Sequence, residues 1–231
     1  MTPLADSPPV LTLAGVRICV DGACLIERFD LALKAGDSTT VCGPPGSGKS
    51  LLLRVAAGLE APAGGTVKIT APLRAFIFQS GGLISNASVT DNLLLPLFYR
   101  GLNKAQALPK VEAALEYFGL DAVAKERPGS LVGESRRLAQ YARAMALDAT
   151  LVYIEEPFAS LSRHSAARVS EWLAGGLMAG KIAAMMTATD PSTLQGLAGR
   201  VLPLSGGGEL GLFVDTLDEA LEEVTEEAVK K

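Results

Sequence analysis

The sequence lacks any apolar run close to the roughly 18 residues that a membrane-spanning helix needs. Its first ten residues, MTPLADSPPV, also lack the basic and apolar blocks of a secretory signal peptide. The 231 residues are nevertheless 48% hydrophobic, which is enough to form a sizeable core. We therefore expect one cytoplasmic α/β domain that reaches a membrane only through a partner protein.

The sequence also has no surplus of basic residues, because it contains 25 acidic and 21 basic residues and its net charge is −4. Residues 216–231 contain six acidic and two basic residues, so the rest of the chain is neutral with 19 of each. No basic face is visible in the sequence. This pattern excludes nucleic acid as an expected partner.

Cysteine is scarce, and the three thiols belong to Cys19, Cys24 and Cys42. Their spacing fits no common metal-ligand pattern. An odd number of cysteines in a cytoplasmic chain predicts free, buried thiols.

The most informative segment present is GPPGSGKS at residues 43–50, which fits the phosphate-binding P-loop pattern G-x-x-x-x-G-K-[ST]. An apolar run at 39–42 precedes it and predicts a buried strand, and residues 51–57 predict a helix. Backbone N–H groups of such a loop and the helix N-terminus bind phosphate oxygens. The expected nucleotide-binding residues are Gly43, Pro44, Pro45, Gly46, Ser47, Gly48, Lys49, Ser50 and Leu51. Lys49 is expected at the β- and γ-phosphates, and the Ser50 hydroxyl is expected at Mg²⁺.

Alternating patterns continue along the chain and predict an α/β fold with a parallel sheet. The predicted strands are two or more within 10–41 and one each at 66–70, 74–78, 151–154, 182–186 and 200–204. A mostly helical insert is expected at 88–126, and a further helix at 135–147.

In this order, the segments resemble the nucleotide-binding subunit of ATP-binding cassette (ABC) transporters, over nearly the whole chain. Gln79 is similar to the Q-loop glutamine of that family, and LVGES at 131–135 stands where its LSGGQ signature would be. Residues 151–156 stand at the Walker B strand, and Thr189 stands at the switch histidine. The resemblance implies a P-loop NTPase fold with a parallel-sheet core, a trimmed antiparallel β-subdomain and a helical subdomain.

A single ABC ATPase domain is therefore expected over 1–231, with its core at about 10–80 and 136–214 and its helical subdomain at about 81–135. A C-terminal helix is expected at about 216–231, where Thr216 and Glu219 form a capping box. Its apolar stripe consists of Leu217, Leu221, Val224 and Ala228. This stripe packs either on its own domain or on a dimer or transporter partner.

Within the family, FQSGGL at 78–83, VTDN at 89–92 and Pro96 with Leu97 look most like ATPases of bacterial MCE/Mla-type lipid transporters. This resemblance implies a lipid as the transported substrate. Many other ABC importers and exporters also carry a V-x-[DE]-N helix start.

The signature segment Val132, Gly133, Glu134 and Ser135 is degenerate, since Val132 replaces a serine and Glu134 replaces a glycine. In the family this segment holds the γ-phosphate bound to the other subunit. A carboxylate close to a polyphosphate is repelled by it. Alternatively, Glu134 points to solvent and the helix N-terminus still works.

The Walker B aspartate is replaced by Glu155, which by resemblance would hold Mg²⁺ together with Ser50 and Gln79. Glu156 stands at the position of the general base that polarises the attacking water. Thr189 cannot carry the positive charge of the histidine it replaces. The single histidine, His164, is expected to be a surface or packing residue, and Ser162 replaces the D-loop aspartate.

These features predict an ATP- and Mg²⁺-binding subunit whose hydrolysis is slow, or absent in the isolated chain. The expected partners are an integral membrane permease at the inner face of the membrane and a second ATPase subunit, identical or different. Two alternatives remain: a non-hydrolysing subunit that pairs with an intact ATPase or regulates a complex, and a soluble scaffold.

Overall fold

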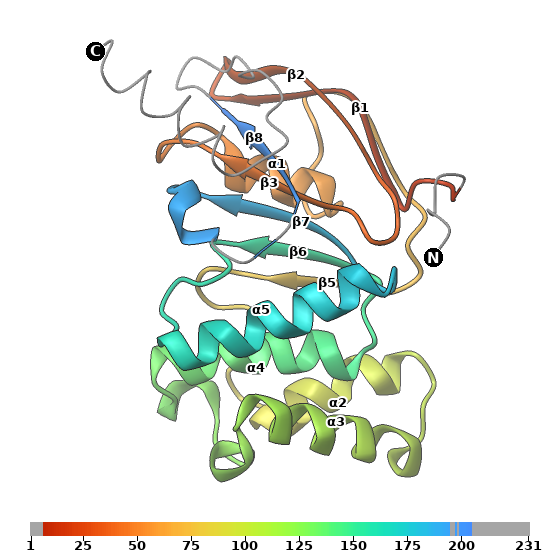
Figure 1. The fold of residues 1–231 in the computed structure, drawn as a ribbon, viewed down its shortest axis with the longest axis vertical. Helices are drawn as coiled ribbons and strands as arrows, with labels where there is room; N and C mark the ends of the chain where they lie inside the picture. Colours follow the sequence, from red (N-terminus) through yellow and green to blue (C-terminus); the bar gives the residue numbers. More distant parts are fainter. Residues whose placement is uncertain (1–6, 195–196, 198, 205–231) are drawn as a thin grey trace.

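The computed structural model describes residues 7–194, 197 and 199–204. Figure 1 shows an antiparallel sheet at the top, a parallel sheet in the middle and helices below it. The candidate site residues lie where the parallel strands end and the chain turns into loops and helices.

The parallel sheet forms the centre of the fold. Its strands, in spatial order, are β5 (Arg74–Ile77), β6 (Leu151–Glu155), β7 (Ala183–Ala188), β3 (Ser38–Cys42) and β8 (Arg200–Pro203). Every residue of β3, β6 and β7 is buried. Strands that are buried along their whole length are typical of a parallel sheet that is covered on both faces.

The antiparallel sheet consists of β2 (Ala23–Leu33), β1 (Leu11–Val20) and β4 (Gly64–Ile69), in that order. The P-loop helix α1 (Lys49–Ala56) lies between the two sheets (Figure 1). Leu13 of β1, Leu53 of α1 and Tyr153 of β6 belong to one buried apolar cluster. This shared core fixes the P-loop between the two sheets.

The other helices form the remaining half of the fold and a second apolar core. They are α2 (Val89–Tyr99), α3 (Lys104–Phe118), α4 (Gly133–Ala146) and α5 (Arg163–Met178), with 3₁₀ turns at Asp121–Val123, Pro128–Ser130 and Pro191–Leu194. Capping boxes start α2 and α3, formed by Ser88 with Asp91 and by Asn103 with Gln106. Gly119 ends α3 in a left-handed conformation, which a glycine adopts without strain.

The predicted fold class is confirmed: the chain has a parallel-sheet core, an antiparallel sheet and helices, each close to the segment that the sequence indicated. The division into core and helical subdomain stays a prediction. The expected C-terminal helix at 216–231 and the glycine-rich turn at 206–208 lie outside the described residues.

The expectation of free, buried thiols is wrong for two of the three cysteines. Cys19 and Cys24 form a disulfide. The register of the β1–β2 hairpin places these two residues directly opposite each other, which no ligand-spacing rule reveals. Cys42 is free and buried, as expected.

Two leucines of α2 allow a matched test of the second core. Leu93 is fully buried, whereas Leu95 is 51% exposed. Leu93→Ala leaves a cavity and should lower the free energy of unfolding by about 2–5 kcal/mol. Leu95→Ala should change it by no more than about 0.5 kcal/mol. Urea unfolding of both variants checks this, and equal losses would contradict the packing described.

Candidate functional site

The P-loop leaves β3 at Cys42 and enters α1 at Lys49. A Cβ atom at Gly43 would lie 2.4 Å from the carbonyl oxygen of Leu204, so only glycine fits there. Gly48 is the N-cap of α1 with φ of 92°, and no side chain caps this helix. The first-turn N–H groups of α1 therefore have no side-chain acceptor and suit an anion.

Lys49 folds back over the same loop. Its Nζ donates to the carbonyl oxygens of Gly43 at 2.7 Å and Pro44 at 2.8 Å. Burial lowers the pKa of the Lys49 ammonium, and the nearby Glu156 carboxylate opposes that shift. The two carbonyl oxygens thus hold the Lys49 ammonium beside the loop, where it could bind a phosphate group.

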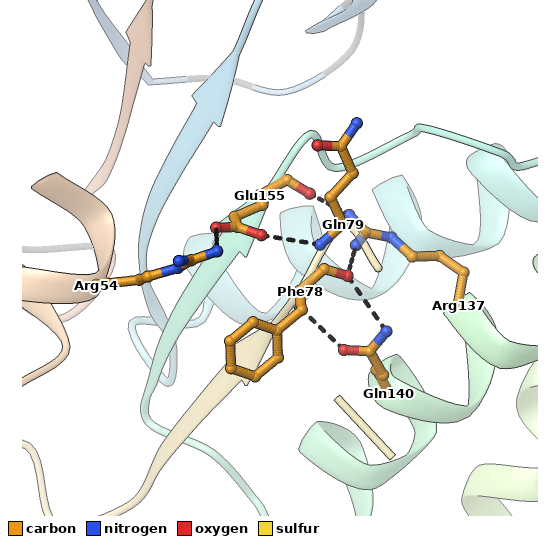
Figure 2. A network of polar contacts seen from close by, with 6 residues as sticks. All are labelled: Arg54, Phe78, Gln79, Arg137, Gln140 and Glu155. Atoms are coloured by element: carbon orange, nitrogen blue, oxygen red, sulfur yellow. Dashed lines mark hydrogen bonds and ion pairs between the residues drawn. The ribbon is translucent and has the colours of Figure 1, made fainter. Parts of the chain in front are cut away.

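Glu155 and Glu156 are adjacent in sequence but have different partners. Oε2 of Glu155 accepts a hydrogen bond from the backbone N–H of Gln79 at 3.0 Å, and Oε1 lies 3.4 Å from Nη2 of Arg54 (Figure 2). Glu156 has φ of 47°, an uncommon conformation for a residue with a side chain. Its Oε1 accepts a hydrogen bond from the Thr189 hydroxyl at 2.6 Å. The structure thus brings the predicted base and the switch-position residue together.

The assignment of Ser50, Gln79 and Glu155 to Mg²⁺ stays a prediction, and the structure shows the surroundings of two of them. In Figure 2 the Gln79 side-chain amide extends away from the Glu155 carboxylate. Oε2 of Glu155 accepts from the Gln79 backbone N–H, whereas Oε1 lies beside Arg54 and is buried without a hydrogen-bond partner. Over the residues that the structure describes, no group of three or more His, Cys, Asp or Glu side chains could hold a metal ion. Oε1 of Glu155 would be the oxygen available to Mg²⁺, and the hydroxyl of the exposed Ser50 would be a second ligand.

Helix α4 joins the ends of β5 and β6 through a set of side chains that the sequence motifs did not single out. Arg137 donates to the carbonyl oxygens of Phe78, Glu155 and Glu156, and Gln140 bonds both the N–H and the carbonyl oxygen of Phe78 (Figure 2). Arg143 donates to the carbonyl oxygen of Gly82 at 2.7 Å. These three residues are spaced three positions apart, which places them on one face of the helix. That spacing is the feature of the sequence that could have indicated them. We call Arg137, Gln140 and Arg143 the α4 clamp.

Glu134, in the first turn of α4, makes a contact within the chain that the sequence did not indicate. Its Oε1 accepts a hydrogen bond from the backbone N–H of Ser162 at 2.8 Å. Ser162 is the N-cap of α5, where N–H groups need acceptors. Hydrogen bonds from Ser165 and Ser162 lower the pKa of the Glu134 carboxyl. The unusual carboxylate of the signature segment thus links two helix starts within the chain.

Comparison with protein families gives a match to the family described as "ABC transporter" over residues 26–159, more than half of the chain. Among curated proteins, the chain is 31% identical over 205 residues to the aliphatic sulfonates import ATP-binding protein SsuB 1 of Nocardia farcinica, covering 88% of this chain and 81% of the relative. It is 29% identical over 199 residues to the lipoprotein-releasing system ATP-binding protein LolD of Chromohalobacter salexigens, covering 79% and 84%.

Two solved structures share the fold. A dimeric ATP-binding cassette in a post-hydrolysis state, bound to ADP and Pi, aligns with a TM-score of 0.80 at 20% identity, covering 89% of this chain and 98% of that one. The protein cbiO1 from Clostridium perfringens, part of the ABC transporter complex cbiONQ, aligns with a TM-score of 0.76 at 17% identity, covering 94% and 92%.

The link from Glu134 to α5 predicts a pH dependence of stability. Because the folded-state pKa of Glu134 is lowered, its contribution is present above the unfolded pKa of about 4.3 and is lost as pH falls through the folded pKa. Wild type should therefore lose more free energy of unfolding than Glu134→Gln between about pH 5 and pH 3. Urea unfolding at each pH measures this.

Glu112→Gln is the control for that experiment, because Glu112 is exposed on α3. This variant should follow the wild-type pH dependence. A Glu134→Gln variant that also follows it would mean that the bond to Ser162 does not stabilise the fold.

Proposed function

Because the chain belongs to the ABC transporter family of ATP-binding proteins, we propose that it binds ATP at residues 43–51 and couples this binding to a membrane permease. The observation that carries the proposal is the uncapped start of α1 beside Lys49. Helix dipole, backbone N–H groups and an ammonium group converge there, which favours a polyphosphate.

Hydrolysis is assigned to Glu156 as the general base. Its carboxylate accepts a bond from Thr189, and Lys49 lies close enough to interact with it electrostatically. A neutral hydroxyl at the switch position supplies less stabilisation to a developing negative charge than a protonated imidazole does. We therefore infer slow turnover, with the Val132–Ser135 segment contributing weakly across a dimer interface. The non-hydrolysing subunit remains the second candidate.

A surface groove supports the permease as partner. It has a volume of about 780 Å³ and is lined by Phe76 and Phe78 of the β5 end and by several side chains of α2. Leu95 is 51% exposed, Phe98 42% and Tyr99 96%. Large apolar side chains exposed together are typical of interaction sites. Among the described residues, no helix has the length and apolar character needed to cross a membrane.

For the substrate, we infer a lipid carried by an MCE/Mla-type system at the inner face of the membrane. The support is the resemblance of residues 78–97 to ATPases of that group. The relatives named above act on different cargo: one is a lipoprotein-releasing ATPase and one a sulfonate importer. Purification from the native host in mild detergent tests the partners: a permease and any second ATPase subunit should co-purify with the chain, and lipid bound to that complex would support the inferred substrate.

Lys49→Ala tests the nucleotide site. Removing the one cation that the P-loop carries should weaken ATP binding by at least about tenfold, since a charge-assisted bond contributes roughly 1.5–3 kcal/mol. Isothermal calorimetry with ATP measures the change. Lys104→Ala is the control, because Lys104 is exposed at the start of α3. Equal affinities in wild type and Lys49→Ala would overturn the proposed site.

Leu95→Asp tests the groove. A carboxylate in an apolar contact is costly to bury, so the variant should leave the membrane fraction of its native host while still binding ATP. Met178→Asp is the control, because Met178 is 81% exposed but lies outside the groove. If wild type itself carries no membrane protein, the permease proposal fails and the soluble scaffold takes its place.

A further inference from the structure

The Cys19–Cys24 disulfide lies near the end of the β1–β2 hairpin, with one residue pair between it and the turn. Asp21 and Gly22 form that turn with φ of 49° and 84°. Positive φ at both central residues is typical of a two-residue type I′ hairpin turn. Cys24 is exposed and Cys19 is half-buried, so a small thiol reductant in solution can reach the disulfide.

The hairpin changes its register immediately beside the disulfide. Ile18 of β1 pairs with Ile26 of β2. The next pair is Cys19 with Cys24, so Leu25 is the extra residue of a β-bulge. A bulge re-aims the side chains of its strand and often lies next to a functional site.

This bulge faces the start of α1. A Cβ atom at Gly48, the N-cap of α1, would lie 3.2 Å from Cβ of Leu25 and 3.6 Å from Cδ1 of Ile26. Two consecutive side chains of β2 therefore pack against the residue that opens the helix. In the proposed function the backbone at this position binds phosphate, so the bulge supports the phosphate-binding conformation of the loop.

Without the disulfide, the hairpin has a second register available. If the pairing of Ile18 with Ile26 continued without a bulge, Cys19 would lie opposite Leu25. The turn would become a three-residue loop over 21–23, which is another common hairpin length. Regular alternation from Ile26 would then place Leu25 on the opposite face of the strand, away from α1.

The disulfide selects between these two registers, because its two cysteines have to lie opposite each other. It closes a loop of only five positions, and the other residue pairs of β1 and β2 do not depend on it. A disulfide in a cytoplasmic protein is usually transient and has a catalytic or redox-sensing role. A chain that works at the inner face of a membrane, as proposed above, would meet that reducing compartment.

We propose that the Cys19–Cys24 disulfide is a redox switch that holds the bulge against Gly48 and thereby strengthens nucleotide binding. This inference rests on the proposed function, since it concerns ATP bound at residues 43–51. The co-reactant is a dithiol: one of its thiolates attacks a sulfur and breaks the S–S bond, and its second thiol displaces the protein sulfur. The products are two cysteine thiols and the cyclic disulfide of the reductant. The freed hairpin end then shifts by one residue, and Leu25 leaves the start of α1.

The test measures ATP–Mg²⁺ affinity by calorimetry before and after reduction with dithiothreitol. The reduced wild type should bind ATP about fivefold or more weakly than the oxidised protein. The double variant Cys19→Ser/Cys24→Ser should bind as weakly as the reduced wild type and should not respond to the reductant. Leu25→Ala lacks the side chain that the switch moves, so reduction should change its affinity by less than about twofold.

Two further measurements keep the test independent of any variant. Thiol titration in denaturant should find one free thiol in the oxidised protein, that of Cys42, and three free thiols there would overturn the proposal. Cross-strand NMR contacts between backbone protons should join Cys19 to Cys24 in the oxidised protein and to Leu25 in the reduced one.

Equal ATP affinity of the two redox states, or the same strand pairing before and after reduction, would overturn the proposal. No ATP binding in either state would instead refute the nucleotide site. The NMR pairing would then decide by itself whether the disulfide controls the register of the hairpin.

Discussion

The α4 clamp is the set of contacts on which the candidate site depends. Arg137 and Gln140 bond the backbone at the end of β5, and Arg137 also bonds the carbonyl oxygens of Glu155 and Glu156. Arg137 is 3% exposed and Gln140 2%, so these bonds are made out of water, where unpaired partners would be costly. The clamp fixes where the polypeptide leaves two neighbouring parallel strands, and thus where Gln79 and both carboxylates lie.

From that common point the two carboxylates diverge. Glu155 is turned toward Arg54, and Glu156 toward Thr189 and the P-loop. The Glu156 charge also acts on Cys42: burial first, and then this charge, raise the pKa of that thiol to about 12. Cys42 thus stays protonated and behaves as a core residue. The Glu155 carboxylate thus contacts Arg54 and the Gln79 backbone, whereas the Glu156 carboxylate lies beside Thr189, although the two residues are neighbours in sequence and of the same type.

The sequence was sufficient for features that depend on short segments. The P-loop with its flanking strand and helix, and the strand that ends in Glu155, needed only local patterns. It was insufficient for contacts that depend on which segments meet in space. Glu134 reaches Ser162 across 28 positions, and Gln140 reaches Phe78 across 62. The Cys19–Cys24 disulfide depends on the register of one hairpin, which a one-residue shift would have changed.

We propose that this fold binds ATP and that Glu156, which accepts a hydrogen bond from the Thr189 hydroxyl, activates water slowly. Steady-state ATP turnover of the purified chain with Mg²⁺ tests this most directly, with Glu156→Gln measured alongside. The account predicts wild-type turnover below about 1 s⁻¹. It also predicts a further loss of about 10²–10⁴-fold in the variant. Wild-type turnover near 10 s⁻¹, typical of enzymes, or an equally active Glu156→Gln variant, would contradict it.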